Sequence, residues 1–322
     1  MSAKRVSRSA GRCAAALLLL LSAGGVSHAD GLIDALVRRF TESEIQFARA
    51  RSNVPFLPAA WLTVSGYQEG RFATPEDGES EVTYRQSSLS EGAFLPLPLG
   101  RRDAVVIGEW LGATQFHVKN TSAHDLNVLS VSVPIGWIRQ ANADWQLAAF
   151  VAPLGSTSRD DDWYWETLGG AFARYTQSDR LYWIFGAYFD VAPLEDFYTP
   201  YLGLTYALDE RWSIEVVLPW PGVSYAPNPN TFFRLGVSPS GASWSVEPGV
   251  RRPRVSLSAW NLGLGAEHRI FGNVWLGVEA GVSGLRGLSI VGGQFESLQT
   301  HMSNTGYASL TINLRPEASS GR

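Results

Sequence analysis

Three segments between Arg180 and Leu218 alternate apolar and polar residues with a period of two, at 181–190, 201–207 and 212–218. This is the pattern of half-buried β-strands, because successive side chains of a strand point to opposite sides. A soluble sheet with one dry face has the same alternation. Aromatic residues at strand ends around apolar centres, however, are typical of a transmembrane β-barrel. Here they are Tyr182, Trp183, Phe185, Tyr188, Phe189, Phe197, Tyr198 and Tyr201.

Residues 1–29 have the features of a secretory signal peptide. Four basic residues precede the apolar run 14–21, which is too short to span a bilayer, and the small residues before position 30 predict cleavage after Ala29. The only cysteine, Cys13, lies in this segment. The mature chain therefore has no thiol, no disulfide and no cysteine-based metal site, and we expect no cofactor.

Removal of the signal peptide leaves 22 basic against 30 acidic residues, because four of the 26 basic residues lie in 1–29, and the net charge becomes −8. This charge provides no basic face for nucleic acid. No later segment has the 18 or more apolar residues of a membrane helix. An exported, aromatic-rich chain without helical spans predicts an all-β protein of the bacterial outer membrane. Its expected partners are outer-membrane lipid and the outer-membrane assembly machinery.

Residues 31–50 predict a short amphipathic helix, with Leu32, Leu36 and Phe40 on one face. A proline-containing breaker follows at 53–58. The helix has three interpretations: a periplasmic lead-in, a plug inside the lumen, or a contact with a partner. The expected organisation is a signal peptide at 1–29, helix and linker at 30–58, a β-barrel at 59–315 and a tail at 316–322.

The barrel region reads as antiparallel strands joined by connections that alternate in length. Short connections rich in Gly, Asn, Asp or Ser are expected at 100–103, 141–144, 177–179, 209–211, 239–241 and 271–273. Longer ones are expected at 70–79, 119–123, 155–161, 192–199, 220–230, 248–253 and 284–300. Short periplasmic turns and long outer loops are typical of an up-and-down outer-membrane barrel.

This division predicts about fourteen strands, an even number that leaves both termini in the periplasm. The expected strands are 61–68, 82–97, 105–116, 126–138, 145–152, 163–175, 181–190, 201–207, 212–218, 232–237, 242–246, 255–267, 274–282 and 307–314. The pair 232–237 and 242–246 is short for a tilted span of about 9–11 residues. Twelve strands with an inward-folded hairpin are the alternative.

Alternation also assigns faces. In the last strand Leu310, Ile312 and Leu314 are expected to face lipid, and Asn313 to face the lumen. A charge facing lipid is costly, so charges within strands should line the pore. The expected pore-lining residues are Glu109, Glu166, Arg174, Asp190, Glu215, Glu267, Arg269 and Glu279. Six acids against two arginines predict a mild cation preference in a lumen wide enough for water.

The run YLGLTYALDERWSIEVVLPWPGVSY, at 201–225, resembles an uncharacterised family of porin-like bacterial outer-membrane β-barrels. In that family a strand ending in Leu-Pro leads to an aromatic residue at a loop, as Leu218-Pro219 and Ser224-Tyr225 do here. The resemblance implies a barrel without assigned chemistry. Such proteins usually end on an aromatic residue, whereas this chain continues past Leu314 as RPEASSGR.

His301-Met302-Ser303-Asn304 is the one catalytic-looking motif. His-x-Ser-Asn on a strand resembles the catalytic stretch of outer-membrane lipid hydrolases, in which a histidine activates a serine two residues on. The resemblance makes Ser303 the nucleophile and His301 its base. A polar strand entry is the simpler interpretation, because the candidates for a third residue, Asn313 and Glu317, do not lie at that family's spacing.

Three functions remain open from the sequence. The favoured one is a porin-like channel for small hydrophilic solutes, which is no enzyme and holds no metal. The second is an esterase or deacylase of outer-leaflet lipid that uses Ser303 and His301. The third is a non-conducting barrel that displays its long loops to a partner.

Overall fold

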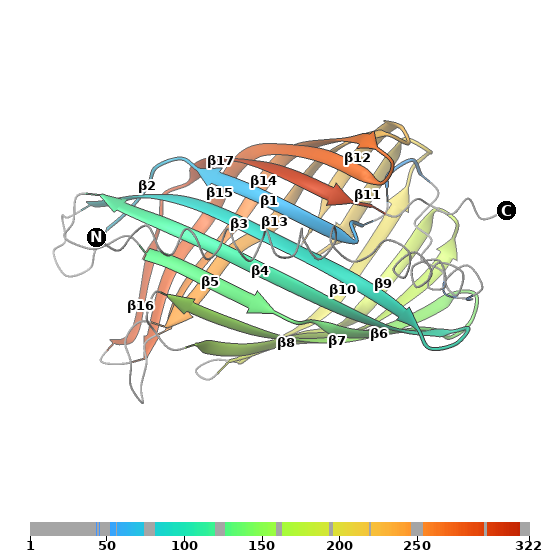
Figure 1. Cartoon of the computed structure of the whole chain (residues 1–322), viewed down its shortest axis with the longest axis horizontal. Helices are drawn as coiled ribbons and strands as arrows, with labels where there is room; N and C mark the ends of the chain where they lie inside the picture. Colours follow the sequence, from blue (N-terminus) through green and yellow to red (C-terminus); the bar gives the residue numbers. More distant parts are fainter. Residues whose placement is uncertain are drawn as a thin grey trace, which may run out of the picture.

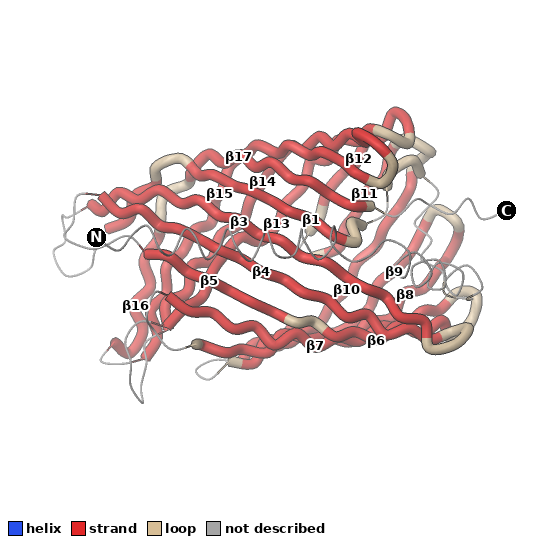
Figure 2. The backbone as a smooth tube through the Cα atoms, in the orientation of Figure 1, coloured by secondary structure: helices blue, strands red, loops and turns tan. Residues whose placement is uncertain are grey.

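In a computed structural model, the structure describes residues 43, 45, 52–55, 57–73, 81–119, 126–158, 163–192, 196–218, 220–245, 254–292 and 295–315. The expected signal peptide, nearly all of the expected helix at 31–50 and the tail at 316–322 lie outside these residues. The described part consists of strands and the connections between them (Figure 2). This described part contains no helix, and therefore no helix long and apolar enough to cross a membrane.

Antiparallel strands form one closed barrel whose axis is roughly horizontal in Figure 1. The strands are β1 Ala60–Tyr67, β2 Gly70–Ala73, β3 Glu81–Pro98, β4 Asp103–Lys119, β5 Leu126–Ser132, β6 Ile135–Gln140, β7 Trp145–Ser158, β8 Tyr164–Ser178, β9 Leu181–Val191, β10 Asp196–Ala207, β11 Trp212–Val217, β12 Gly222–Asn228, β13 Thr231–Ser245, β14 Arg254–Phe271, β15 Val274–Gly292, β16 Phe295–His301 and β17 Thr305–Leu314.

Three pairs of these strands are the two parts of one barrel strand. β1 and β2 both pair with β3, β5 and β6 both pair with β4 and β7, and β16 and β17 both pair with β15. The barrel therefore has fourteen strands. It closes where β1 pairs with β17, from Ala60 opposite Leu314 to Tyr67 opposite Tyr307. The predicted fold class and strand number are confirmed.

The individual strand assignments differ from the prediction in several regions. The segments 232–237 and 242–246 are not a hairpin but parts of the single strand β13, and 239–241 is no turn. Conversely, the expected loop 220–230 contains β12. One strand was predicted too many and one too few, so the total is unchanged. The expected loop 284–300 was also wrong, because β15 continues to Gly292 and β16 begins at Phe295.

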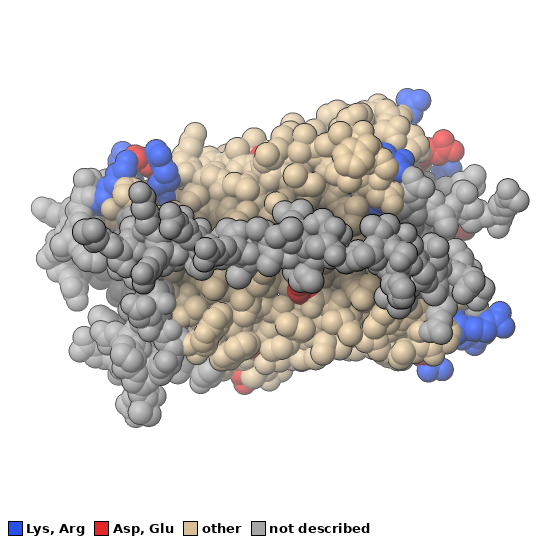
Figure 3. All heavy atoms as spheres, viewed as in Figure 1, with Lys and Arg blue, Asp and Glu red and all other residues tan. Residues whose placement is uncertain are grey.

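The outer wall is apolar across neighbouring strands. Val64 lies opposite Leu310 on one side and opposite Leu89 on the other, and their side chains are 51%, 48% and 38% exposed. In β17, Leu310, Ile312 and Leu314 are exposed while Asn313 is buried, as alternation predicted. Figure 3 shows blue basic residues at the two ends of the barrel, with a largely uncharged wall between them. This arrangement suits a wall surrounded by hydrocarbon.

The end at which β1 begins and β17 ends also carries the short turns. Ala59 donates its N–H to the carbonyl of Leu314 at 2.7 Å, and Arg315 donates to that of Asn273 at 2.9 Å. Residues before β1 cross this mouth of the barrel, because the N–H of Asn53 donates to the carbonyl of Glu210 at 2.6 Å. We call this the short-turn end. The opposite end holds the longer β2–β3 and β13–β14 connections.

Candidate functional site

The candidate site is the lumen, whose side chains alternate with the apolar outer wall. One layer of it, near the end opposite the short turns, is centred on Arg286, which is only 2% exposed. Its Nη1 donates to Oγ1 of Thr305 at 2.9 Å and its Nη2 to Oε1 of Gln86 at 2.7 Å. The guanidinium also lies over the rings of Tyr67 and Tyr84, at 5.2 and 5.6 Å from their centroids. We call these five residues the Arg286 layer.

Strands that are not neighbours in the wall meet in this layer. The hydroxyl of Tyr67 on β1 lies 3.0 Å from Oγ of Ser240 on β13, and Nδ2 of Asn261 on β14 donates to it at 3.2 Å. β1 and β13 are separated by three intervening barrel strands along the shorter way round, so these hydrogen bonds cross the lumen. They join the walls directly.

An apolar cluster lies beside this polar layer. Leu257 on β14 packs into one buried cluster with Met302, at the break between β16 and β17, and with Tyr84, Phe116 and Val128 on β3, β4 and β5. At the backbone level, β7 and β13 approach each other to within 8 Å between Cα atoms, although they lie on opposite sides of the barrel. The lumen is therefore narrow at this level, because two strands on opposite sides of the barrel come this close.

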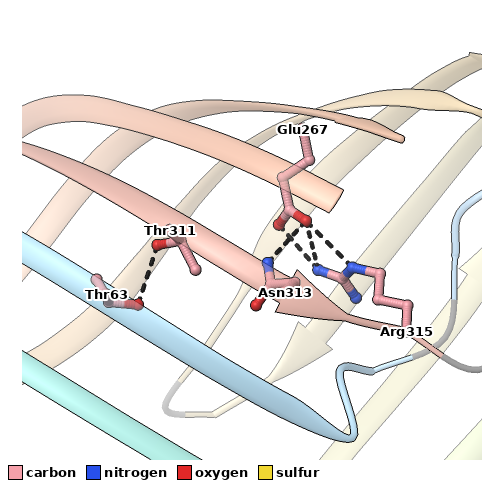
Figure 4. Close-up of polar contacts among 5 residues, drawn as sticks. All are labelled: Thr63, Glu267, Thr311, Asn313 and Arg315. Atoms are coloured by element: carbon pink, nitrogen blue, oxygen red, sulfur yellow. Dashed lines mark hydrogen bonds and ion pairs between the residues drawn. The ribbon is translucent and has the colours of Figure 1, made fainter. Parts of the chain in front are cut away.

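A second cluster lies at the short-turn end (Figure 4). Nη2 of Arg315 donates to Oε1 of Glu267 at 2.8 Å, and its Nε donates to Oε2 at 3.1 Å. Nδ2 of Asn313 donates to the same carboxylate at 2.9 Å. The guanidinium of Arg315 lies over the rings of Phe232 and Trp275, and Val54 from the chain before β1 belongs to the same buried cluster as these rings. Such bidentate pairing supplies partners for the buried guanidinium and for the partly buried carboxylate.

Seven of the eight predicted pore-lining residues lie on the lumen face of their strands: Glu166, Arg174, Asp190, Glu215, Glu267, Arg269 and Glu279. Two of them contact tyrosines. The Arg174 guanidinium lies 5.1 Å from the ring centroid of Tyr182, and the hydroxyl of Tyr307 donates to Oε1 of Glu279 at 2.5 Å.

Glu109 is placed differently. It shares the outer face of β4 with Ile107, whose side chain is 41% exposed, whereas Phe116 on the other face is buried in the lumen cluster. The sequence assigned it to the lumen because a charge facing lipid is costly. In the structure the β3–β4 register has no interruption, so alternation along β4 places Glu109 on the outer face.

Three lumen arginines escaped the sequence analysis: Arg234, Arg286 and Arg315. Arg234 shares the buried face of β13 with Phe232, and its Nη2 donates to the carbonyl of Trp220 at 3.0 Å. Arg286 fell in a segment expected to be a loop, and Arg315 lies one residue beyond the last expected strand. Arg234 lay inside the expected strand 232–237 and was overlooked. Alternation from Asn313 would have found Arg315, whereas Arg286 faces inward only because the alternation breaks at Leu285.

Ser303 of the hydrolase motif contacts the backbone of Arg71. The hydroxyl of Ser303 accepts the backbone N–H of Arg71 at 2.8 Å, and the N–H of Ser303 donates to the carbonyl of Arg71 at 2.9 Å. Ser303 thus joins the first and last barrel strands at the break between β16 and β17. Across the described ranges, no group of three His, Cys, Asp or Glu side chains is arranged to hold a metal ion.

No family model matches the chain, and no curated protein matches its sequence. Solved structures with a similar course of the chain include outer-membrane channels and autotransporter domains, all with TM-scores below 0.5. A deltaS2 mutant of the TodX monoaromatic hydrocarbon channel has a TM-score of 0.48 at 10% identity, covering 83% of this chain and 93% of that one. A FadL homologue of Pseudomonas aeruginosa has a TM-score of 0.43 at 10% identity, covering 85% and 97%. An outer-membrane channel of Pseudomonas putida F1 has a TM-score of 0.42 at 10% identity, covering 84% and 100%.

Proposed function

We propose that this protein is an outer-membrane channel for small solutes, and that the described conformation is its closed state. The observation that carries the proposal is the Arg286 layer together with the approach of β7 and β13. Side chains of strands three and four apart are hydrogen-bonded inside the barrel, and two strands on opposite sides come within 8 Å between Cα atoms. A barrel of fourteen strands has an interior wider than the side chains of its own wall fill. A lumen that is closed by a hydrogen-bonded polar layer, and not by a continuous apolar core, can open when these hydrogen bonds break.

The charge of the lumen bears on which solutes would pass. With the three added arginines and without Glu109, the described lumen holds as many arginines as carboxylates: Arg174, Arg234, Arg269, Arg286 and Arg315 against Glu166, Asp190, Glu215, Glu267 and Glu279. Opposite charges in equal number produce little net field, so selectivity between small ions should be weak. The cation preference expected from the sequence thereby loses most of its support. Small polar molecules without a strong net charge fit this lumen best.

The test is single-channel recording of the refolded mature protein in a planar bilayer, under a salt gradient. We expect long closed periods broken by stable openings, with a reversal potential close to zero. Protein that is verified as a folded, heat-modifiable barrel and never opens, even after the Arg286 layer is removed by substitution, would overturn the channel proposal.

The closed lumen also favours one alternative, a non-conducting barrel that displays its loops at the end opposite the short turns. The same recordings separate the two functions, because only the channel gains openings when the layer is weakened. A lipid hydrolase has no comparable support, since the Ser303 hydroxyl is held by the Arg71 backbone. Lipid hydrolysis by the wild type that is lost in Ser303→Ala would restore that reading.

A further inference from the structure

Arg286 is a buried cation whose hydrogen-bond partners in the Arg286 layer are neutral. Its side chain is 2% exposed, and it donates to the hydroxyl of Thr305 and to the carboxamide of Gln86. Among the residues that the structure describes, no carboxylate lies within ion-pair distance of the guanidinium. A charge that is taken out of water is strongly destabilising unless an opposite charge compensates it. The Arg286 guanidinium therefore requires a negative partner.

Arg315 shows such a guanidinium with its negative partner built in. Both arginines are nearly buried, and each lies over two aromatic rings. The carboxylate of Glu267 pairs with Arg315 (Figure 4). For Arg286 the corresponding side chain is Gln86, which has nearly the same shape as a glutamate. Gln86 supplies an acceptor oxygen but no charge.

Buried donors in the same region have no hydrogen-bond partner among the described residues. They are Nε of Arg286 and Oγ of Ser283, a fully buried side chain on the inner face of β15. Oδ1 of Asn261, opposite Ser283 in the register, is unpartnered as well. Exchange of the amide nitrogen and oxygen of Asn261 lets Tyr67 donate to that oxygen and makes Nδ2 a further unpartnered donor. Buried donors of this kind bond a water molecule or an ion, and only an anion also supplies the negative charge.

Glu279, the lumen carboxylate further along β15 toward the short-turn end, is held elsewhere. Its Oε1 accepts the hydroxyl of Tyr307 at 2.5 Å. Its carboxylate lies against the backbone of β14, because a Cβ added at Gly263 would be 2.8 Å from Oε1 and one at Gly265 would be 3.4 Å from Oε2. These contacts keep Glu279 away from Arg286.

We propose that the Arg286 layer binds one small monovalent inorganic anion of the size of chloride. The anion accepts the Nε–H of Arg286 and the hydroxyl of Ser283, and its charge takes the role that Glu267 has for Arg315. One negative charge balances one guanidinium, and the close burial of the layer favours a small ion over a large one. The inference rests on the side-chain contacts of the layer and does not require that the barrel conducts. A barrel that never opens would therefore leave it untouched.

Urea unfolding of the refolded mature protein at constant ionic strength, followed by heat-modifiability, tests the proposal. Chloride replaces gluconate, which is too large for a buried site, in steps over the millimolar range. We expect the wild-type midpoint to rise with chloride, because a ligand that binds only the folded state stabilises it. Gln86→Glu places a carboxylate beside the guanidinium, so it should remove this dependence and raise the midpoint in gluconate. Arg286→Gln removes the charge that requires the anion and should also remove the dependence, so the test does not rely on one variant.

The matched control is Gln146→Glu. Gln146 is an inward-facing glutamine opposite Arg174 in the β7–β8 register, so the control adds the same charge beside another lumen arginine. It should keep the full chloride dependence. Chloride that raises the midpoints of wild type, Gln86→Glu and Arg286→Gln equally would be acting as a general salt, which would overturn the proposal. A wild-type midpoint that does not respond to chloride would overturn it too.

Discussion

The Arg286 guanidinium on β15 donates to the side-chain carbonyl of Gln86 on β3, at 2.7 Å. The barrel strand formed by β16 and β17 and the one formed by β1 and β2 lie between them in the wall. The bond therefore spans the inside of the barrel and not the sheet. A second bond, to Oγ1 of Thr305 at 2.9 Å, joins the same guanidinium to β17, the strand next to β15.

Arg286→Ala should open the lumen. The substitution removes two hydrogen bonds to a charged group, which contribute about 1.5–3 kcal/mol each, and it leaves an empty space between Tyr67 and Tyr84. If the closed state depends on them, the ratio of open to closed channel should rise about tenfold or more. Single-channel recording measures this ratio. Arg174→Ala is the control, because it removes a lumen arginine outside the layer, and an equal effect of both variants would contradict the assignment.

Glu267→Gln should destabilise the barrel at the short-turn end. The Arg315 side chain is 7% exposed, and the substitution removes the charge of its Glu267 partner at nearly unchanged volume. Breaking a buried ion pair in this way costs about 3 kcal/mol. Urea unfolding followed by heat-modifiability gives the change in midpoint. Thr311→Val, which removes the hydrogen bond between Thr63 and Thr311 nearby (Figure 4), should cost only about 1 kcal/mol. A smaller loss for Glu267→Gln than for Thr311→Val would count against this view.

Much of the barrel could be predicted because alternation and aromatic ends are local signals. The error at β13 has a local cause too, since Pro239, Ser240 and Gly241 read as a turn. In the structure the N–H of Val237 donates to Pro221, just before the start of β12. The nitrogen of Pro239, two residues further along β13, points to the same side, where β12 has not yet begun. Proline therefore removes no ladder hydrogen bond there, and β13 continues along β14.

The closure of the lumen could not be predicted, because it depends on pairs far apart in the sequence. Tyr67 and Ser240 are separated by 173 residues, and Arg286 and Gln86 by 200. Alternation places each residue on the inner face but does not say which residues of the opposite wall it meets. The local break at Leu285, where φ is 48°, shifts the β14–β15 register and directs Arg286 inward. Gly284 and Gly287 around it had suggested a loop.

The lumen charges should act on ion selectivity in opposite directions. Glu279→Gln removes one carboxylate and should shift the reversal potential toward anion preference, whereas Arg234→Gln should shift it toward cation preference. Both residues lie on the lumen face, and their wild-type contributions oppose each other. The measurement is the reversal potential across a salt gradient in the Arg286→Ala background, which supplies open channels. Shifts of the same sign, or none in either variant, would show that these residues do not face the ion path.

The turn between β10 and β11 should make a small pH-dependent contribution to stability. Oδ1 of Asp209 accepts the N–H groups of Trp212 and Arg211, both at 2.7 Å. These two bonds, the Trp212 one foremost, hold the pKa of this exposed carboxyl below its ordinary value of 3.8. A lowered folded-state pKa means that the stabilisation is present above the ordinary value and is lost as the pH falls below it.

Asp209→Asn keeps an acceptor oxygen but not the charge. The difference in unfolding midpoint between wild type and Asp209→Asn should therefore be largest near neutral pH and shrink between about pH 4 and pH 2. Asp144→Asn, in another turn of the same end, controls for the loss of one negative charge. A difference that stays constant over this pH range would exclude the hydrogen-bonded carboxylate as its source.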